Sequence, residues 1–170
     1  MSIFIALLRG INVGGTGVLP MKELAGLCSG LGFQAARTYI QSGNVIFESC
    51  LSEEDVRSSL EKALATRMGK NIDVIVRTPA EMRSVLKSNP FPDKEPAKVA
   101  VAFLRGPPPK DLMKNAAAPG GEQVKAGKRE VYIFYPDGMG RSKLKLPLNG
   151  AAATVRNINT VTKLVALTES

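Results

Sequence analysis

Two short runs of the sequence are apolar on both faces of an extended chain, and they constrain the fold more than any other feature. Residues 2–8 read SIFIALL, and residues 98–104 read KVAVAFL. Successive side chains of a strand point to opposite faces of its sheet, so a strand that is apolar on both faces must be covered on both sides. The sequence therefore predicts two central, buried strands, one in each half of the chain.

The segments around the first run predict the order βαββαβ for residues 1–78. Residues 20–31 and 52–68 have the apolar spacing of helices, and Ser52 and Asp55 are spaced as a capping box. Residues 36–40, 44–48 and 72–77 read as strands, with a tight turn at residues 41–43. This order is that of the ferredoxin-like split βαβ fold, in which the first strand is central and the fourth lies at an edge.

The second half repeats this order without a clear last strand. Residues 79–96 read as a helix and a proline-rich connection, and residues 97–170 as a βαββα subdomain with C-terminal helices. Short helices are predicted at residues 107–117, 142–146 and 159–167. The predicted fold class is α+β, with two tandem ferredoxin-like subdomains packed together and the second one incomplete.

Composition excludes several kinds of chemistry. Histidine is absent, which excludes Ser-His-Asp and Cys-His nucleophiles, and no metal site is expected because only two cysteines are present. No apolar run approaches the length of a membrane helix, and no basic region precedes the N-terminal apolar stretch. We therefore expect a cytoplasmic protein that does not contact membranes, with Cys28 and Cys50 as free thiols.

The positive charge is concentrated in the second half. The net charge of the chain is +8, and residues 79–170 hold 15 basic and 8 acidic residues, or +7 of the total. Such an excess favours a polyanionic or phosphorylated partner. A merely soluble basic surface is the alternative interpretation.

A glycine-rich loop follows the first buried strand, in residues 6–15 (ALLRGINVGG). In the split βαβ order this loop and residues 41–44 lie at the same end of the sheet. An arginine beside bare glycine backbone suits a phosphate or a carboxylate. Alternatively, the asparagines satisfy turn backbone and Arg9 pairs with a carboxylate. A P-loop is not indicated, because Thr16 stands where the phosphate-binding lysine is required.

Two further stretches carry similar chemistry. Arg141, Ser142 and Lys143 stand at the expected start of a helix, where an anion can bind. Arg156, Asn157 and Asn159 precede the last helix, with Asn159 or Thr160 as its expected cap. The alternative for each stretch is plain capping and solvated charge.

Five blocks of the chain, in order, resemble the Domain of Unknown Function 1697 (DUF1697) family: ALLRGINVGG, TYIQSGNVIF, NPF, YPDGMGRSKL and RNINTVTKL. The resemblance covers nearly the whole chain and implies a compact α+β protein of paired ferredoxin-like units, without an established reaction. Ile158 stands where the family commonly has tryptophan. The family blocks place polar or glycine residues at Arg9, Gly10, Asn12, Gly14, Gly15, Gln41, Ser42, Gly43, Asn44, Arg141, Ser142, Lys143, Arg156, Asn157, Asn159 and Thr160.

These features predict that a small phosphorylated or anionic ligand, for example one like a nucleotide, binds in a basic cleft between the subdomains. The alternative is a nucleic-acid-binding protein that works mainly through phosphate contacts. Neither a reaction, a cofactor nor an oligomeric state follows from the sequence. Positive charge would come from Arg9, Arg141, Lys143 and Arg156, while Asn12, Gly14, Gly15, Ser42, Asn44, Ser142, Asn157 and Asn159 would contact or orient the ligand.

Overall fold

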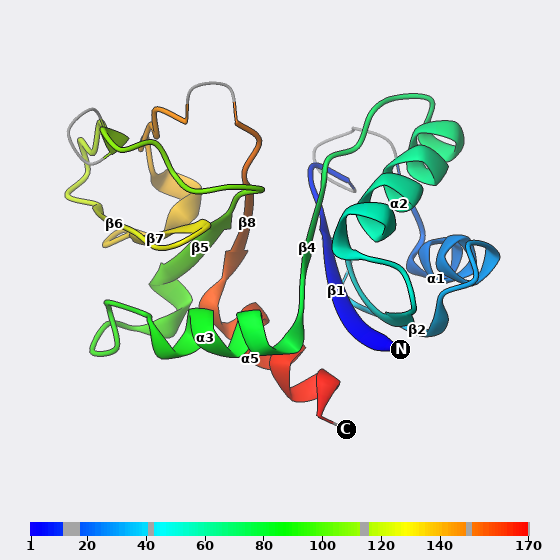
Figure 1. Ribbon diagram of the computed structural model, residues 1–170. Helices are drawn as coiled ribbons and strands as arrows, with labels where there is room; N and C mark the ends of the chain where they lie inside the picture. Colours follow the sequence, from blue (N-terminus) through cyan, green and yellow to red (C-terminus); the bar gives the residue numbers. More distant parts are fainter. Residues whose placement is uncertain (12–17, 41–42, 113–115, 149–150, 170) are drawn as a thin grey trace. The chain divides into compact units, whose positions relative to one another are not determined.

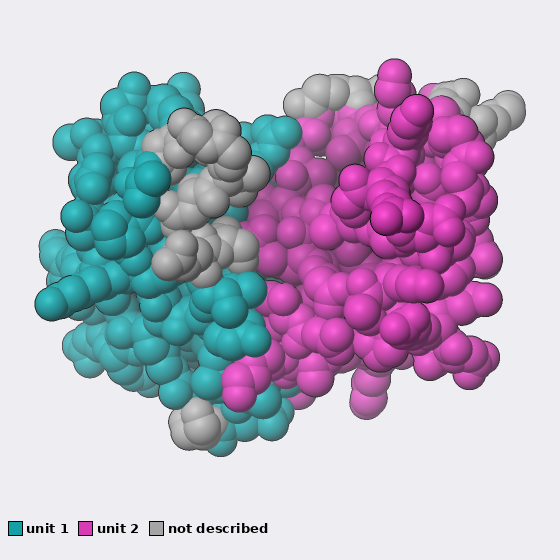
Figure 2. All heavy atoms as spheres, turned by 180° about the vertical axis from the view of Figure 1, so that it is seen from behind, with its two compact units in different colours: residues 1–82, 164–170 teal, residues 83–163 magenta. Residues whose placement is uncertain are grey.

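The computed structural model describes residues 1–11, 18–40, 43–112, 116–148 and 151–169, and it divides into two compact units (Figures 1 and 2). Unit 1 comprises Met1–Met82 and Leu164–Ser170, and unit 2 comprises Arg83–Lys163. The fold is α+β, and each unit is built on a four-stranded antiparallel sheet. The division at residues 78 and 96 that the sequence indicates stays a prediction.

The sheet of unit 1 has the strand order β2-β3-β1-β4. β1 is central and pairs antiparallel with both β3 and β4, while β4 lies at an edge, as predicted. The capping box of the second helix is also confirmed, since the Asp55 amide donates to the Ser52 hydroxyl. The elements of this unit are β1 (Ser2–Leu8), α1 (Met21–Gly30), β2 (Gln34–Tyr39), β3 (Asn44–Ser49), α2 (Glu53–Met68) and β4 (Val74–Arg77).

β1 is buried on both faces, as its composition requires. Phe4, Ala6 and Leu8 face the core that α1 and α2 cover, where Phe33 stacks on Phe47 with ring centroids 4.4 Å apart. Ile5 and Leu7, on the other face, are also fully buried. Burying one such aliphatic side chain contributes about 1.5–3 kcal/mol, so this strand anchors the loops at its ends firmly.

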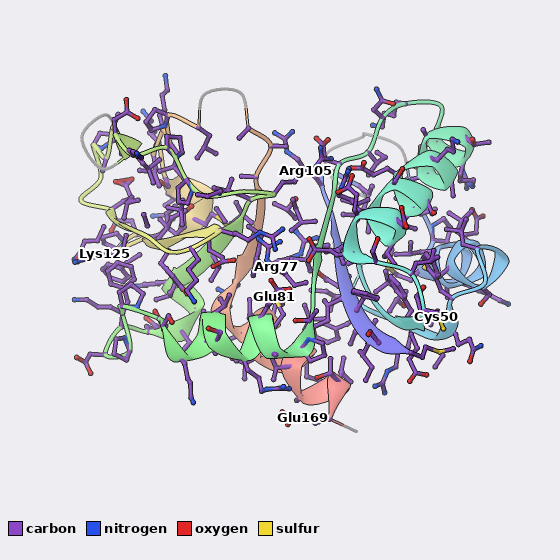
Figure 3. All side chains as sticks on the ribbon, in the orientation of Figure 1. Cys50, Arg77, Glu81, Arg105, Lys125 and Glu169 are labelled. Carbon is purple, nitrogen blue, oxygen red and sulfur yellow. The ribbon has the colours of Figure 1, made fainter. Side chains whose placement is uncertain are left out.

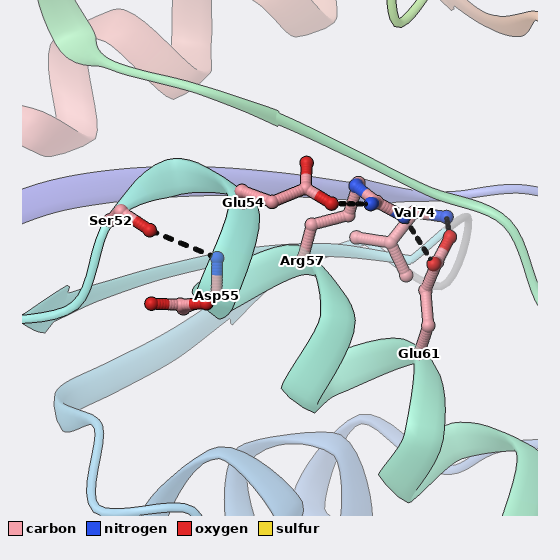
Figure 4. A network of polar contacts seen from close by, with 6 residues as sticks. All are labelled: Ser52, Glu54, Asp55, Arg57, Glu61 and Val74. Carbon is pink, nitrogen blue, oxygen red and sulfur yellow. Dashed lines mark hydrogen bonds and ion pairs between the residues drawn. The ribbon is translucent and has the colours of Figure 1, made fainter.

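A polar network ties α2 to the start of β4 (Figure 4). Glu61 accepts a hydrogen bond of 2.6 Å from Arg57 and one of 3.0 Å from the Val74 amide. Arg57 also pairs with Glu54, one turn earlier on the helix. Val74 is opposite Leu8 in the sheet, so the network fixes the end of β1 from which the Arg9 loop leaves.

The helix α3 (Pro79–Lys87) begins at residue 79, as predicted, and it has a complete capping box. The Glu81 amide donates to the Thr78 hydroxyl, and the Thr78 amide donates to the Glu81 carboxylate. The end of α3 belongs to unit 2, where the buried Tyr132 hydroxyl donates a 2.9 Å hydrogen bond to the Val85 carbonyl. This bond attaches α3 to the second sheet.

Unit 2 contains a complete four-stranded sheet in the order β6-β7-β5-β8. β5 is central and fully buried, as predicted, but the prediction that this half lacks its last strand is wrong. β8 pairs with β5 along residues for which the sequence predicts no strand. The elements are η1 (Pro96–Lys98), β5 (Val99–Phe103), β6 (Gln123–Ala126), β7 (Glu130–Phe134), η2 (Met139–Arg141), β8 (Thr154–Asn157) and α5 (Ile158–Thr168).

The helix predicted at residues 142–146 is also wrong. The chain there is extended, and Lys145 forms an isolated antiparallel β-bridge with Ala117. Leu144, Leu146 and Leu148 pack against the core of unit 2. Alternate side chains of an extended segment share a face, so the Lys-Leu alternation has the period of a strand rather than of a helix. The predicted helix at residues 107–117 includes residues that lie outside the described ones.

The two cysteines differ in their surroundings. Cys28 lies on the buried face of α1, and burial raises the pKa of its thiol to about 12. Cys50 is exposed after β3 (Figure 3), and both thiols are free. Among the described residues, no helix combines the length and the apolar character that crossing a membrane requires.

Candidate functional site

Three segments of unit 2 enclose a pocket of about 160 Å³. The first precedes β6, the second is the turn after β7, and the third is the end of η2 with the residues that follow it. The turn after β7 closes through a hydrogen bond from the Gly138 amide to the Tyr135 carbonyl, and Gly138 has a φ of 85° that favours glycine. The lining residues are Pro119, Gly120, Glu122, Tyr135, Pro136, Asp137, Gly138, Arg141, Ser142 and Lys143.

Glu122 holds the first and third segments together. Its Oε2 accepts a 2.9 Å hydrogen bond from the Gly120 amide, and its Oε1 accepts a 2.9 Å bond from the Ser142 hydroxyl. The Ser142 oxygen in turn accepts from the Leu144 amide. Hydrogen bonds from backbone amides, its own first, and from Ser142 lower the pKa of Glu122. The carboxylate is therefore ionised at neutral pH and committed to the wall of the pocket.

Arg141 and Lys143 supply two positive charges beside this wall. Both side chains are exposed, and neither forms an ion pair with a residue of the described ranges. Arginines of unit 1 behave differently, since Arg57 pairs with Glu61 and Arg67 with Glu23. Two cations that line one pocket without a protein partner can both bind an anion.

Tyr135 and Asp137 complete the polar lining. Tyr135 is buried, and burial, together with the nearby charge of Glu122, raises the pKa of its phenol. The phenol is therefore a neutral hydrogen-bonding group at physiological pH. Asp137 is exposed, and its carboxylate forms no ion pair with any residue that the structure describes. The pocket thus combines two cations, two carboxylates and a phenol, a set suited to binding a polar ligand.

The loops at the end of the first sheet converge as predicted, for the residues described. The Leu8 amide donates to the Gly43 carbonyl, and the Arg9 amide donates to the Asp73 carbonyl. The Arg9 side chain lies 3.4 Å from the Asp73 carboxylate and is half exposed. The buried Asn44 side chain donates to the Tyr39 carbonyl, which holds the β2–β3 turn. Asn12, Gly14, Gly15 and Ser42 lie outside the described residues.

The third predicted stretch lies on β8 and at the start of α5. Arg156 is buried, its guanidinium donates to the Val155 carbonyl, and desolvation lowers its pKa to about 10, so it stays charged at neutral pH. Asn157 accepts from the Asn159 amide and donates to the Ala97 carbonyl. Asn157 is therefore the cap of α5, where the sequence predicts Asn159 or Thr160. The Asn159 side chain is exposed.

The net charges of the two units differ more than those of the two halves of the sequence. Unit 1 holds 8 basic and 9 acidic residues and unit 2 holds 15 basic and 6 acidic ones, so their net charges are −1 and +9. Arg9 belongs to the nearly neutral unit, whereas Arg141, Lys143 and Arg156 belong to the basic one. The charge of unit 2 as a whole therefore attracts anions toward that unit.

Sequence reasoning found three lining residues, Arg141, Ser142 and Lys143, and missed the others. Asp137 lies in the turn after β7 and Tyr135 directly follows that strand, so neither stands out in the sequence as a ligand-binding residue. Glu122 lies twenty residues before Ser142 in the sequence. The two glycines that precede Glu122 are the one sequence signal that another group approaches the backbone closely there. A Cβ on Gly120 would lie 2.8 Å from the Glu122 carboxylate, so a side chain there would force this carboxylate to move.

Comparison with known proteins finds a family whose model matches the chain and a solved structure with a similar fold. The family described as "Protein of unknown function (DUF1697)" matches residues 1–132. The conserved bacterial protein SP0830 from Streptococcus pneumoniae has a similar structure, with a TM-score of 0.77 and 23% sequence identity over 97% of each chain. At that identity the likeness concerns the fold alone. No curated protein matches the chain.

Proposed function

The chain belongs to the DUF1697 family, and we propose that it binds a small phosphorylated or otherwise anionic ligand in the pocket of unit 2. One observation carries the proposal: Arg141 and Lys143 line the same pocket and have no ion-pair partner among the described residues. A guanidinium and an ammonium together offer a fork and a point charge to an anion.

The wall beside the cations supports the proposal through its rigidity. Glu122 fixes Ser142, the residue between the two cations, to the segment before β6. A site whose backbone is fixed before binding loses less entropy when the ligand arrives.

The finer description of the architecture, two tandem ferredoxin-like subdomains packed together, is likewise our proposal.

A thermal-shift screen tests the proposed function. Phosphate-bearing compounds at about 100 times their Kd should stabilise the protein by about 2.7 kcal/mol and raise Tm by roughly 5–10 °C. Arg141→Gln should reduce the shift to less than half of the wild-type value, whereas Lys125→Gln should keep it. Lys125 is an exposed residue of β6 outside the pocket lining (Figure 3), which makes it a matched control for loss of charge. Equal shifts in the wild type and in Arg141→Gln would contradict the proposal.

The net charge of +9 on unit 2 favours nucleic-acid binding as a second candidate function. A protein that neutralises six phosphates should lose about 10³-fold in affinity between 50 and 200 mM salt. A pocket that binds one small anion should show a much shallower dependence. Filter binding that detects no nucleic-acid affinity at 50 mM salt would eliminate this candidate.

A further inference from the structure

The pocket of unit 2 contains an anionic group that is free to bind a ligand, as well as two cationic ones. Asp137 lines the same space as Arg141 and Lys143, yet it pairs with neither, nor with any other residue in the described part of the chain. Opposite charges that share a pocket without neutralising each other are all available to a molecule placed between them. Asp137 is thus a candidate acceptor for a donor group of the ligand.

Glu122 adds negative charge but is not available as a second acceptor in the same way. Its two oxygens already accept from Gly120 and Ser142. The formal charges of the lining, two positive and two negative, therefore cancel. A polyanion would meet two carboxylates in this space, whereas a ligand with one anionic and one cationic group would find a partner for each.

The size of the pocket limits the ligand further. Its volume of about 160 Å³ is close to the about 150 Å³ cavity that accommodates benzene in an engineered protein core. Pockets for drug-sized ligands are larger, at about 300–1,000 Å³. The enclosed part of the ligand therefore has roughly six to ten non-hydrogen atoms. A phosphate or carboxylate on a short aliphatic amine has this size, whereas most of a whole nucleotide would lie outside the pocket.

We infer that the pocket of unit 2 takes a small zwitterion, whose anionic group binds Arg141 and Lys143 and whose protonated amine binds Asp137. This inference rests on the proposed function and specifies the class of ligand. It makes Asp137 a specificity residue, because only the amine distinguishes this ligand from a simple phosphate ester.

Calorimetry with three matched probes tests the inference. O-phosphoethanolamine carries both groups, ethyl phosphate only the anion, and ethanolamine only the amine. The wild-type protein should bind O-phosphoethanolamine roughly tenfold or more tightly than ethyl phosphate, which corresponds to about 1.4 kcal/mol, and ethanolamine more weakly than either. Asp137→Asn should remove this preference without weakening ethyl phosphate. Asparagine tolerates the same turn, and Asp93→Asn, at an exposed site outside the lining, is the control.

The outcomes separate this inference from the function on which it rests. Equal affinity for O-phosphoethanolamine and ethyl phosphate in the wild type, with Arg141→Gln weakening both, would overturn the zwitterion and leave the anion site standing. A preference that survives in Asp137→Asn would equally overturn the role of Asp137. If no probe binds the wild-type protein, both proposals fail. Circular dichroism of each variant establishes that it is folded. If Asp137→Asn does not fold, Asp137→Ser serves as a second variant.

Discussion

The Ser142 hydroxyl donates a hydrogen bond of 2.9 Å to Oε1 of Glu122. This bond joins two segments of the pocket wall and contributes to lowering the pKa of the carboxyl. A carboxyl whose pKa is lower in the folded state stabilises the fold above its ordinary pKa of 4.5, and this stabilisation is lost as the pH falls through the folded value. Ser142 is therefore linked to acid stability as well as to the shape of the pocket.

Ser142→Ala should raise the pKa of Glu122 and weaken ligand binding. The substitution removes one donor to the carboxylate and the acceptor of the Leu144 amide. Carbon-detected NMR of the Glu122 side chain during a pH titration measures the pKa directly. Ser142→Thr, which keeps the hydroxyl, is the control and should resemble the wild type. An unchanged Glu122 pKa in Ser142→Ala would show that the bond is not formed in solution.

Gly43→Ala should destabilise the protein by roughly 2 kcal/mol or more. Gly43 has a φ of 90°, and a Cβ there would lie 2.7 Å from Ile11 Cδ1 and 3.0 Å from Leu8 Cβ. Gly69→Ala is the matched control, because Gly69 has a φ of 71° but open space around it. Its cost should be about 1–2 kcal/mol, from backbone strain alone. Urea unfolding measures both values, and equal costs would mean that the contact with Ile11 relaxes freely.

The sequence predicted the fold well wherever the side chains repeat with one clear period. The two-faced strands β1 and β5, the central place of β1, and the capping of α2 and α3 all follow from apolar spacing and terminal residues. β8 (TVRN) was missed because Val155 is its one aliphatic residue, whereas the equally short β4 (VIVR) has three. A segment with so few apolar residues lacks the pattern that marks a strand, so only its pairing with β5 reveals it.

The candidate site was predicted in part for a similar reason. Arg141, Ser142 and Lys143 are consecutive, so their chemistry is visible in the sequence. Glu122 and Tyr135 enter the pocket through the turns before β6 and after β7, which the sequence does not place side by side. The alternation of Lys143, Leu144, Lys145 and Leu146 has a period of two, which indicates an extended chain rather than the predicted helix.

Tyr132→Phe should cost about 1 kcal/mol at pH 7, and the cost should shrink above pH 10. The substitution leaves the Val85 carbonyl without its donor. Burial, and then the charge of Glu130, raise the pKa of Tyr132 from 10.0 to about 12. A raised pKa means that this residue's stabilisation is complete below pH 10 and is lost between about pH 10 and 12. Between pH 7 and pH 11, the free energy of unfolding of the wild type should therefore fall by roughly 1 kcal/mol more than that of Tyr132→Phe.

Urea unfolding of both proteins at pH 7, 9 and 11 checks this prediction. Titration of the lysines is common to the two proteins and cancels in the difference. A difference in unfolding free energy that stays constant across the three pH values would show that the Tyr132 phenol ionises as it does in the unfolded chain.

Arg9 and Arg141 belong to different units, and the sequence predicts that they bind one ligand in a shared cleft. If so, Arg9→Ala and Arg141→Ala should each weaken binding of ethyl phosphate by about 1.5–3 kcal/mol, and their effects should be non-additive. Arg9→Ala should change stability little, because its pair with Asp73 is a surface ion pair. Calorimetry of the double-mutant cycle measures the coupling. Single effects that simply add would show that Arg9 does not act on the ligand bound beside Arg141.

The location of the bound anion is the most direct test of the account. Backbone amide shifts of ¹⁵N-labelled protein can be followed while ethyl phosphate is added. We predict saturable shifts of the Gly138, Arg141, Ser142 and Lys143 amides, with the same Kd for all four, and their loss in Arg141→Gln. Saturable shifts confined to other residues, with these four amides unmoved, would contradict the assignment of the anion site to this pocket.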